Sequence, residues 1–150
     1  MPINNLLTPA RILCDVRGAS KKKILEHIAL RISEEFPDVN PRELLCRFVH
    51  RERLGTTVLD SGIALPHCRS KCCPAPVGLF IKLNTPIDFN TTTHTLVDLV
   101  FALVVPEEET QNHINLLKQL VTRLQSQKLL HDIRVTSSPE EIYRRLIADC

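Results

Sequence analysis

The residues best suited to chemistry lie at the end of a short apolar segment, where Pro66 precedes His67. Gly62 permits a tight backbone turn before the segment, residues 63–65 are expected to be buried, and Pro66 fixes its own φ angle. His67 is therefore expected to sit on a stiff, partly buried support. An imidazole in such a place titrates near neutral pH and suits a nucleophile or a ligand. The alternative is a histidine with a purely structural role in a turn or core.

Two more stretches extend this pattern. An Arg-Glu-x-Leu-Gly-x-Thr run begins at Arg51 and leads into the Gly-Ile-Ala-x-Pro-His sequence that ends at His67. Further along the chain, a Val-Pro-Glu-Glu-x-x-x-x-His-x-x-Leu-Leu run contains His113. The three elements, in this order, resemble the IIA components of the bacterial phosphoenolpyruvate:sugar phosphotransferase system. The resemblance is greatest to the mannitol/fructose-type family and its nitrogen-regulatory branch, and it spans about residue 3 to about residue 148.

The resemblance implies a phosphotransferase component whose His67 carries a phosphoryl group received from an HPr-like phosphocarrier protein. Arg51 and His113 fall where the family has its supporting arginine and second histidine, and Thr57 matches a family position from which a hydroxyl could be donated. A guanidinium suits this role because it keeps its charge and binds phosphoryl oxygens in a bidentate manner. Without the resemblance, each residue has a structural alternative. Arg51 is then a cation at a helix terminus, and His113 is a buried histidine bonded to a carbonyl. We expect no cofactor and no metal.

Other positions depart from the family or match none of its functional residues. Val58, Asp60 and Ser61 differ from the commonest pattern of the family, which leaves the details of the pocket open. A carboxylate would repel a phosphoryl group, so we expect Asp60 to point outward. The remaining histidines are interpreted as surface or structural residues, namely His27, His50, His94 and His131.

Within the family, the sequence favours the nitrogen-regulatory branch, which regulates target proteins instead of feeding a transporter. The chain stops at Cys150 with no linker and no membrane segment, whereas sugar-specific IIA domains are commonly joined to further parts. The stretches 77–83 and 86–89 also look most like that branch. Two alternatives remain: a sugar-specific IIA of the fructose or mannitol type, and a IIA-like domain that only docks. Arg51, His67 and His113 occur together, which argues against the second.

The composition predicts one ordinary globular domain over residues 1–150. Apolar residues make up 43% of the 150 and charged residues 24%, and the net charge is +2. This charge is too small to indicate nucleic-acid binding, for which a clustered basic face is expected. No apolar stretch reaches the ~20 residues that a membrane span needs, and the N-terminus lacks the pattern of a signal peptide. We therefore expect a cytoplasmic protein with no membrane insertion.

Six cysteines leave three interpretations open. The cluster formed by Cys68, Cys72 and Cys73 follows His67 directly, yet a structural zinc site usually needs two separated ligand pairs. A disulfide is uncommon in the cytosol. Free thiols are therefore favoured over a zinc site and over a regulatory disulfide.

The hydrophobic pattern predicts helices and buried strands in turn. Ser20 and Asn40 read as helix caps, for helices ending near residues 36 and 51. Further helices are expected from Pro106 and from Ser138, where acidic residues occupy the first turn. Two apolar runs, 77–83 and 95–105, predict buried strands separated by a loop over 84–94.

This order of elements predicts an α/β fold, with a mixed β-sheet flanked by helices on both faces. The resemblance implies the same sandwich. Three lysines, Lys21, Lys22 and Lys23, begin the first helix, where the helix dipole disfavours cations. They read most simply as a solvated helix start, and alternatively as a patch that docks a partner or attracts anions.

Overall fold

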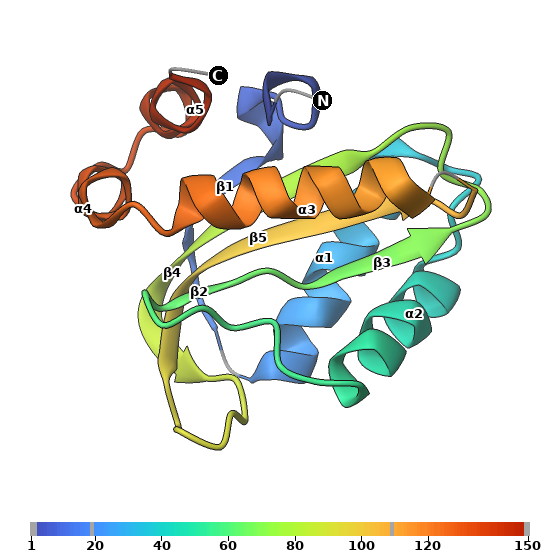
Figure 1. The fold of residues 1–150 in the computed structure, drawn as a ribbon, viewed down its shortest axis with the longest axis horizontal. Helices are drawn as coiled ribbons and strands as arrows, with labels where there is room; N and C mark the ends of the chain where they lie inside the picture. Colours follow the sequence, from blue (N-terminus) through green and yellow to red (C-terminus); the bar gives the residue numbers. More distant parts are fainter. Residues whose placement is uncertain (1–2, 19, 109, 149–150) are drawn as a thin grey trace.

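A computed structural model describes residues 3–18, 20–108 and 110–148. Its central feature is a mixed five-stranded sheet with helices on both faces, as predicted (Figure 1). The strands are β1 (Ile12–Val16), β2 (Ile63–Ala64), β3 (His67–Ser70), β4 (Val77–Asp88) and β5 (Leu96–Pro106). The α-helices are α1 (Lys21–Glu35), α2 (Pro41–Arg53), α3 (Thr110–Leu124), α4 (Gln127–Arg134) and α5 (Pro139–Ile147). Short 3₁₀ turns, η1 (Ile3–Asn5) and η2 (Pro9–Arg11), precede β1.

Strand β5 lies in the middle of the sheet. It pairs antiparallel with β4 on one side and parallel with β2 and β3 on the other, and β1 continues the sheet as a parallel neighbour of β4. Nearly all of β5 is buried because both of its faces are covered. Parallel neighbours cannot be joined by a tight turn. Here the chain leaves β3, forms β4 further across the sheet, and only then returns as β5 beside β2 and β3.

Two hydrophobic cores lie on opposite faces of the sheet. The first is formed by α1 and α2 against one face, with Phe48 from α2 completely buried. The second is formed by α3, α4, α5 and the N-terminal turns against the other face, with Phe80 and Phe101 in an edge-to-face contact at its centre. Figure 1 shows α3 crossing the sheet on the face opposite to α1. Alternate residues of β4 and β5 point into the two cores, which is why both strands read as continuous apolar runs.

The predicted helix starts are confirmed at three places. The side chain of Ser20 accepts a hydrogen bond from the backbone of Lys23, and Asn40 accepts from two backbone amides of α2. Ser138 caps α5 in the same way. These side chains satisfy amides that the first helical turn leaves without a backbone partner.

Several predicted boundaries were wrong. Helix α2 continues to Arg53 instead of ending near Arg51. Strand β4 continues to Asp88, through part of the expected loop, because its polar second half forms an irregular pairing with β5. Pro106 ends β5 instead of opening a helix, and α3 begins at Thr110; one residue of the expected acidic start, 109, lies outside the described residues.

Candidate functional site

His67 is the first residue of β3, beside the centre of the sheet. It lies opposite Leu103 of β5, and the backbone amide of Leu103 donates a 3.0 Å hydrogen bond to the carbonyl of Pro66. Pro66 has no backbone N–H that could donate to a neighbouring strand, and it lies between the short strand β2 and β3. The backbone that carries His67 is thus fixed to a buried strand, as the sequence predicted.

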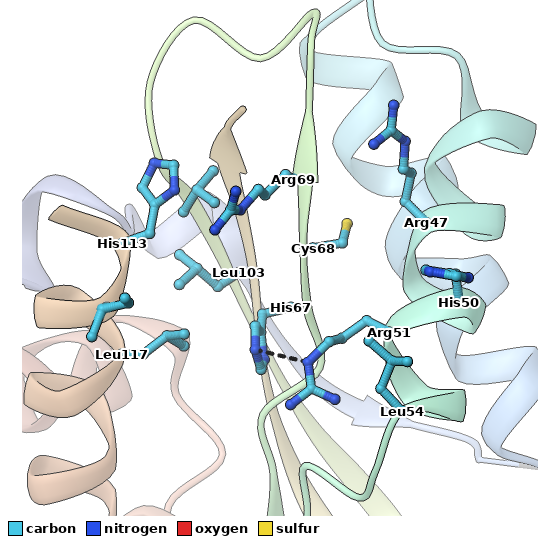
Figure 2. A pocket seen from close by; sticks show the side chains of 12 residues that line it. Arg47, His50, Arg51, Leu54, His67, Cys68, Arg69, Leu103, His113 and Leu117 are labelled. Atoms are coloured by element: carbon cyan, nitrogen blue, oxygen red, sulfur yellow. Dashed lines mark hydrogen bonds between the residues drawn. The ribbon is translucent and has the colours of Figure 1, made fainter. Parts of the chain in front are cut away.

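The imidazole of His67 is oriented by contacts to both of its ring nitrogens. Nδ1 lies 2.8 Å from the carbonyl oxygen of Leu65, to which it donates, since a carbonyl only accepts. Nε of Arg51 donates to Nε2 at 3.3 Å (Figure 2). Together these contacts select the tautomer that has its proton on Nδ1 and a lone pair on Nε2. Nε2 is therefore the nitrogen available to attack an electrophile.

The surroundings keep this imidazole neutral. Burial lowers the pKa of His67, and the positive charge of Arg51 acts in the same direction. The hydrogen bond to Leu65 and the negative charge of Glu52 oppose this effect without reversing it. A neutral ring has an unprotonated nitrogen, which a nucleophile requires.

Arg51 is placed by the last turn of α2. Besides contacting His67, its Nη1 donates to the carbonyl of Gly55 at 3.1 Å. Gly55 has a φ of 155°, a backbone conformation that favours glycine, and it turns the chain back under the guanidinium. The helix end and the turn together hold Arg51 beside the ring.

His113 reaches the same place from the opposite side. It lies in the first turns of α3, its exposed fraction is 4%, and it lines the pocket that also contains His67 and Arg51. In Figure 2, α3 and α2 flank β3, so that the side chains of His113 and Arg51 approach the pocket from different helices. The structure therefore brings together three of the four residues that the sequence singled out.

The pocket has a volume of about 300 Å³ and combines cations with apolar side chains. Arg47 and His50 contribute from α2 and Arg69 from β3. Of these, Arg69 was expected on this surface because it follows His67 closely, Arg47 was not singled out in the sequence, and His50 was interpreted as a surface or structural residue. The apolar lining includes Leu54, 73% exposed, and Ile114, 40% exposed. The signal that could have indicated Arg47 is its place four residues before Arg51, on the same face of α2.

Thr57, the fourth predicted site residue, is not among the residues that line this pocket. Its side chain is buried, and its hydroxyl donates to Oε1 of Glu52. The residues that depart from the family pattern are also elsewhere, since Val58, Asp60 and Ser61 line a separate hollow with two glutamines, Gln125 and Gln127. Asp60 is exposed, as expected.

Among the described residues, no three or more histidine, cysteine or acidic side chains are grouped so that they could hold a metal ion. The described cysteines, Cys14, Cys46, Cys68, Cys72 and Cys73, are free thiols. Within the same ranges, each helix is too short or too polar to cross a bilayer.

The sandwich fold and the pocket around His67 define a IIA component of a phosphotransferase system. The model of the family "Phosphoenolpyruvate-dependent sugar phosphotransferase system, EIIA 2" matches residues 5–149, and the chain belongs to that family.

Within this family, the chain is similar to nitrogen regulatory proteins. It is 36% identical over 145 residues to one from Pseudomonas aeruginosa, covering 97% of this chain and 94% of the relative. The solved structure of the nitrogen regulatory protein IIA-Ntr from Neisseria meningitidis superposes with a TM-score of 0.89 at 29% identity, covering 96% of this chain and 98% of that one. The mannitol IIA of Escherichia coli shares the fold, with a TM-score of 0.78 at 20% identity over 93% of this chain and 98% of that one.

Proposed function

We propose that this protein is a phosphohistidine carrier that accepts a phosphoryl group on Nε2 of His67 and regulates other proteins according to its phosphorylation state. The observation that carries the proposal is the fixed, neutral imidazole, with Nδ1 bonded to the Leu65 carbonyl and Nε2 beside Arg51. The ring is oriented before any donor arrives, so little reorganisation is needed when the reaction begins.

The transfer is a direct exchange of two phosphorus–nitrogen bonds. The lone pair of Nε2 attacks the phosphorus of a phosphohistidine on the donor while the bond from phosphorus to the donor ring breaks, and the donor nitrogen keeps that electron pair. Nδ1 retains its proton and its hydrogen bond to the Leu65 carbonyl throughout. Charge spreads over the phosphoryl oxygens as they pass between the rings, so fixed positive groups stabilise the transition state.

Arg51 and His113 are the groups we assign to that stabilisation. Arg51 already touches Nε2 and has donors left over for phosphoryl oxygens. His113 lines the opposite side of the pocket and would donate from its ring. Thr57 takes a different part from the one the sequence suggested, because its hydroxyl proton is directed to Glu52.

The proposed donor is an HPr-like phosphocarrier protein, as the family implies. A protein donor must bring its own histidine within bonding distance of His67, so it has to cover the pocket. The exposed apolar side chains Leu54 and Ile114, together with Arg47 and Arg69, fit a partner with an apolar centre and acidic groups around it.

The regulatory part of the proposal is supported by the nitrogen regulatory relatives, and it extends to a site of action in the cytoplasm, where such a donor would act. We also propose that residues 1–150 act as one domain, since both cores are built on a single sheet.

The test is phosphorylation with purified partners. The protein is incubated with enzyme I, an HPr-type carrier and labelled phosphoenolpyruvate, and the label is expected to be acid-labile and base-stable, as phosphoramidates are. His67→Ala should abolish labelling, while His50→Ala, which alters another histidine that lines the pocket, should retain it. Full labelling of His67→Ala would overturn the proposal. Transfer onward to a sugar-specific IIB domain at a comparable rate would favour a transport role over regulation.

A further inference from the structure

A buried ion pair joins the start of α1 to the end of α2. Nζ of Lys21 lies 2.9 Å from Oε2 of Glu52, and the exposed fractions of the two side chains are only 19% and 4%. Nζ of Lys21 also lies 5.6 Å from the centre of the Phe89 ring. Lys21 is therefore held between a carboxylate and an aromatic face, unlike its exposed neighbour Lys22. Lys21 is therefore not the solvated residue at a helix start that the sequence predicted.

Burying such a pair gives little stability by itself. The loss of hydration offsets much of the attraction between the two charges, and apolar side chains of similar size often serve as well or better. Glu52 also has a second partner, because Thr57 donates its hydroxyl to Oε1. Both carboxylate oxygens are thus engaged, one by a cation and one by the turn that follows α2. This arrangement fixes the geometry of the turn, whatever its effect on stability.

The turn leads directly to the phosphorylation site. The carbonyl of Thr57 accepts a 2.9 Å hydrogen bond from the amide of Leu65, and the carbonyl of Leu65 accepts from Nδ1 of His67. A continuous series of contacts therefore runs from Lys21 to the imidazole.

Glu52 also affects the second functional residue. It directly follows Arg51 in α2, and the guanidinium of Arg51 is bonded to Gly55 within the same turn. Any displacement of residues 52–57 would alter both the carbonyl that fixes the tautomer of His67 and the direction of Arg51.

The charge of Glu52 is the second part of the argument. The charged and titratable groups that face His67 come from α2, β3 and α3; they are Arg47, His50, Arg51, Glu52, Cys68, Arg69 and His113. Glu52 is the single carboxylate in this set of described residues, and its negative charge acts on the imidazole. An unopposed carboxylate there would repel an incoming phosphoryl group. Lys21 opposes it from the side away from the pocket, where it lines a different hollow.

We propose that Lys21, Glu52 and Thr57 form a positioning network, in which Glu52 and Thr57 hold the turn that orients His67 and Arg51, and Lys21 neutralises the carboxylate beneath them. The inference rests on the proposed function of His67 as phosphoryl acceptor. None of the three side chains contacts the phosphoryl group. Each acts through another residue, with Thr57 as a support for the Leu65 carbonyl.

The test uses the full chain and begins with the imidazole of His67, observed by nitrogen NMR over a pH titration. Lys21→Met should raise the pKa of His67, because it removes a cation and leaves the Glu52 charge unopposed. Glu52→Gln should lower that pKa, because it removes the anion and keeps the lysine. The double variant should return towards the wild type, since the amide still accepts from Thr57 and no unpaired charge is left.

Thr57→Val tests the geometric part. It should shift the ring nitrogens away from the pattern of a single Nδ1-protonated tautomer, and Thr57→Ser, which keeps the hydroxyl, should restore that pattern. Phosphotransfer in Lys21→Met and Thr57→Val should fall about tenfold, which is the lower end of the loss seen when the partners that orient metal-binding side chains are removed. The double variant and Thr57→Ser should recover most of the rate.

Matched controls change the same residue types elsewhere. Lys22→Met, Glu34→Gln and Thr122→Val alter exposed side chains and should leave the titration and the rate unchanged. The inference would be overturned if the pKa and the tautomer pattern of His67 in all three network variants equalled those of the controls. It would also be overturned if the double variant showed no return of the pKa towards the wild-type value. The NMR result does not depend on phosphorylation. A wild-type protein that is not labelled on His67 would therefore overturn the proposed function while leaving the contacts of the network established.

Discussion

Nε of Arg51 donates to Nε2 of His67 at a distance of 3.3 Å, so the guanidinium contacts the same nitrogen that is proposed to attack phosphorus. The contact keeps a positive charge beside the proposed nucleophile before any phosphoryl group arrives. A second donor of Arg51 holds the Gly55 carbonyl, which leaves the guanidinium anchored when Nε2 is used for bonding to phosphorus. A charge fixed in advance is worth more to a transition state than one that must be recruited.

Replacement of Arg51 should therefore impair transfer much more than folding. Arg51→Ala is expected to slow phosphoryl acceptance by roughly 10²–10³-fold, the loss typical of removing one charge-stabilising donor. Arg51→Lys should recover only part of the rate, since an ammonium cannot bind two oxygens in a planar, bidentate manner. Single-turnover transfer from the phosphorylated carrier measures this. Arg53→Ala is the control, because Arg53 lies two residues on and lines another hollow. Rates within twofold of the wild type for both Arg51 variants would contradict the assignment.

His113 should show a similar but separable effect. His113→Ala is expected to slow transfer by about 10²-fold or more for the same reason as Arg51. Because His113 is buried in α3, its loss also removes packing, so melting temperatures must be compared. His113→Gln keeps much of the volume and one amide donor, and it should be faster than His113→Ala. Equal rates for wild type and both variants, in folded protein, would show that His113 plays no part in transfer.

The lowered pKa of His67 predicts how acceptance and stability depend on pH. Acceptance should be independent of pH above about 6.5 and should decline only below that value, since the neutral ring is the nucleophile. In the window between the lowered pKa and about 6.5, the unfolded chain binds a proton at His67 that the folded protein does not. Folding stability therefore falls as the pH falls through this window, and it gains nothing further from this group above it.

Urea unfolding of wild type and His67→Gln at several pH values checks the stability part. The unfolding free energy of the wild type, relative to that of His67→Gln, should fall as the pH is lowered from about 7.5 to about 5.5. A constant difference would mean that the ring titrates normally in the folded protein.

Much of the fold could be predicted from the sequence because its signals are local. Caps such as Ser20 and Asn40 act within one helical turn, and β5 is buried on both faces, so its pattern is unmistakable. Strand β1 was missed, since most of its residues are only half-buried and the exposed Asp15 has a positive φ at an irregular pairing. Helix α4 was missed because it has only eight residues. Short elements of this kind depend on tertiary packing more than on local sequence.

The candidate site was predicted through the family resemblance, because His67 and Arg51 each have a structural alternative when taken alone. The structure places the two side chains in contact. Thr57 was predicted as a site residue because it matches a family position, but a sequence match cannot show which way a hydroxyl points; the structure directs it to Glu52. The contribution of Lys21 was equally hidden, since it comes from a different helix and depends on a contact formed only in the folded chain.

Burial also predicts the order in which the cysteines react. Burial raises the pKa of the Cys68 thiol to about 12, and burial likewise raises the pKa of Cys73. Cys46 and Cys72 are exposed. Because the thiolate is the reactive form, iodoacetamide at about pH 8 should modify the two exposed cysteines first and Cys68 last among these four. Peptide mass spectrometry over a time course measures the order, and unfolding in urea should abolish the differences. Modification of Cys68 as fast as that of Cys72 would show that this part of β3 opens readily.

The last prediction concerns the regulatory output. The proposed phosphorylation of His67 would add about −1.5 to −2 charges and three strong acceptor oxygens to a surface that carries Arg47 and Arg69. A target that docks over the pocket would meet a strongly changed charge without any change of fold. We therefore expect a target protein to discriminate between the unphosphorylated and phosphorylated forms, with His67→Asp in between, because one carboxylate supplies a single charge.

Titration calorimetry with an identified target measures these three affinities, and surface variants identify the face. Arg69→Ala should weaken binding of a target that prefers the unphosphorylated protein and carries acidic groups of its own. Lys71→Ala is the matched control, because Lys71 is exposed close to Arg69 in the chain but does not line the pocket. If the target instead used the far side of the sheet, all three forms would bind equally and neither variant would matter. That result would exclude a charge switch at the pocket around His67, because any protein that docks there must contact the phosphoryl group itself.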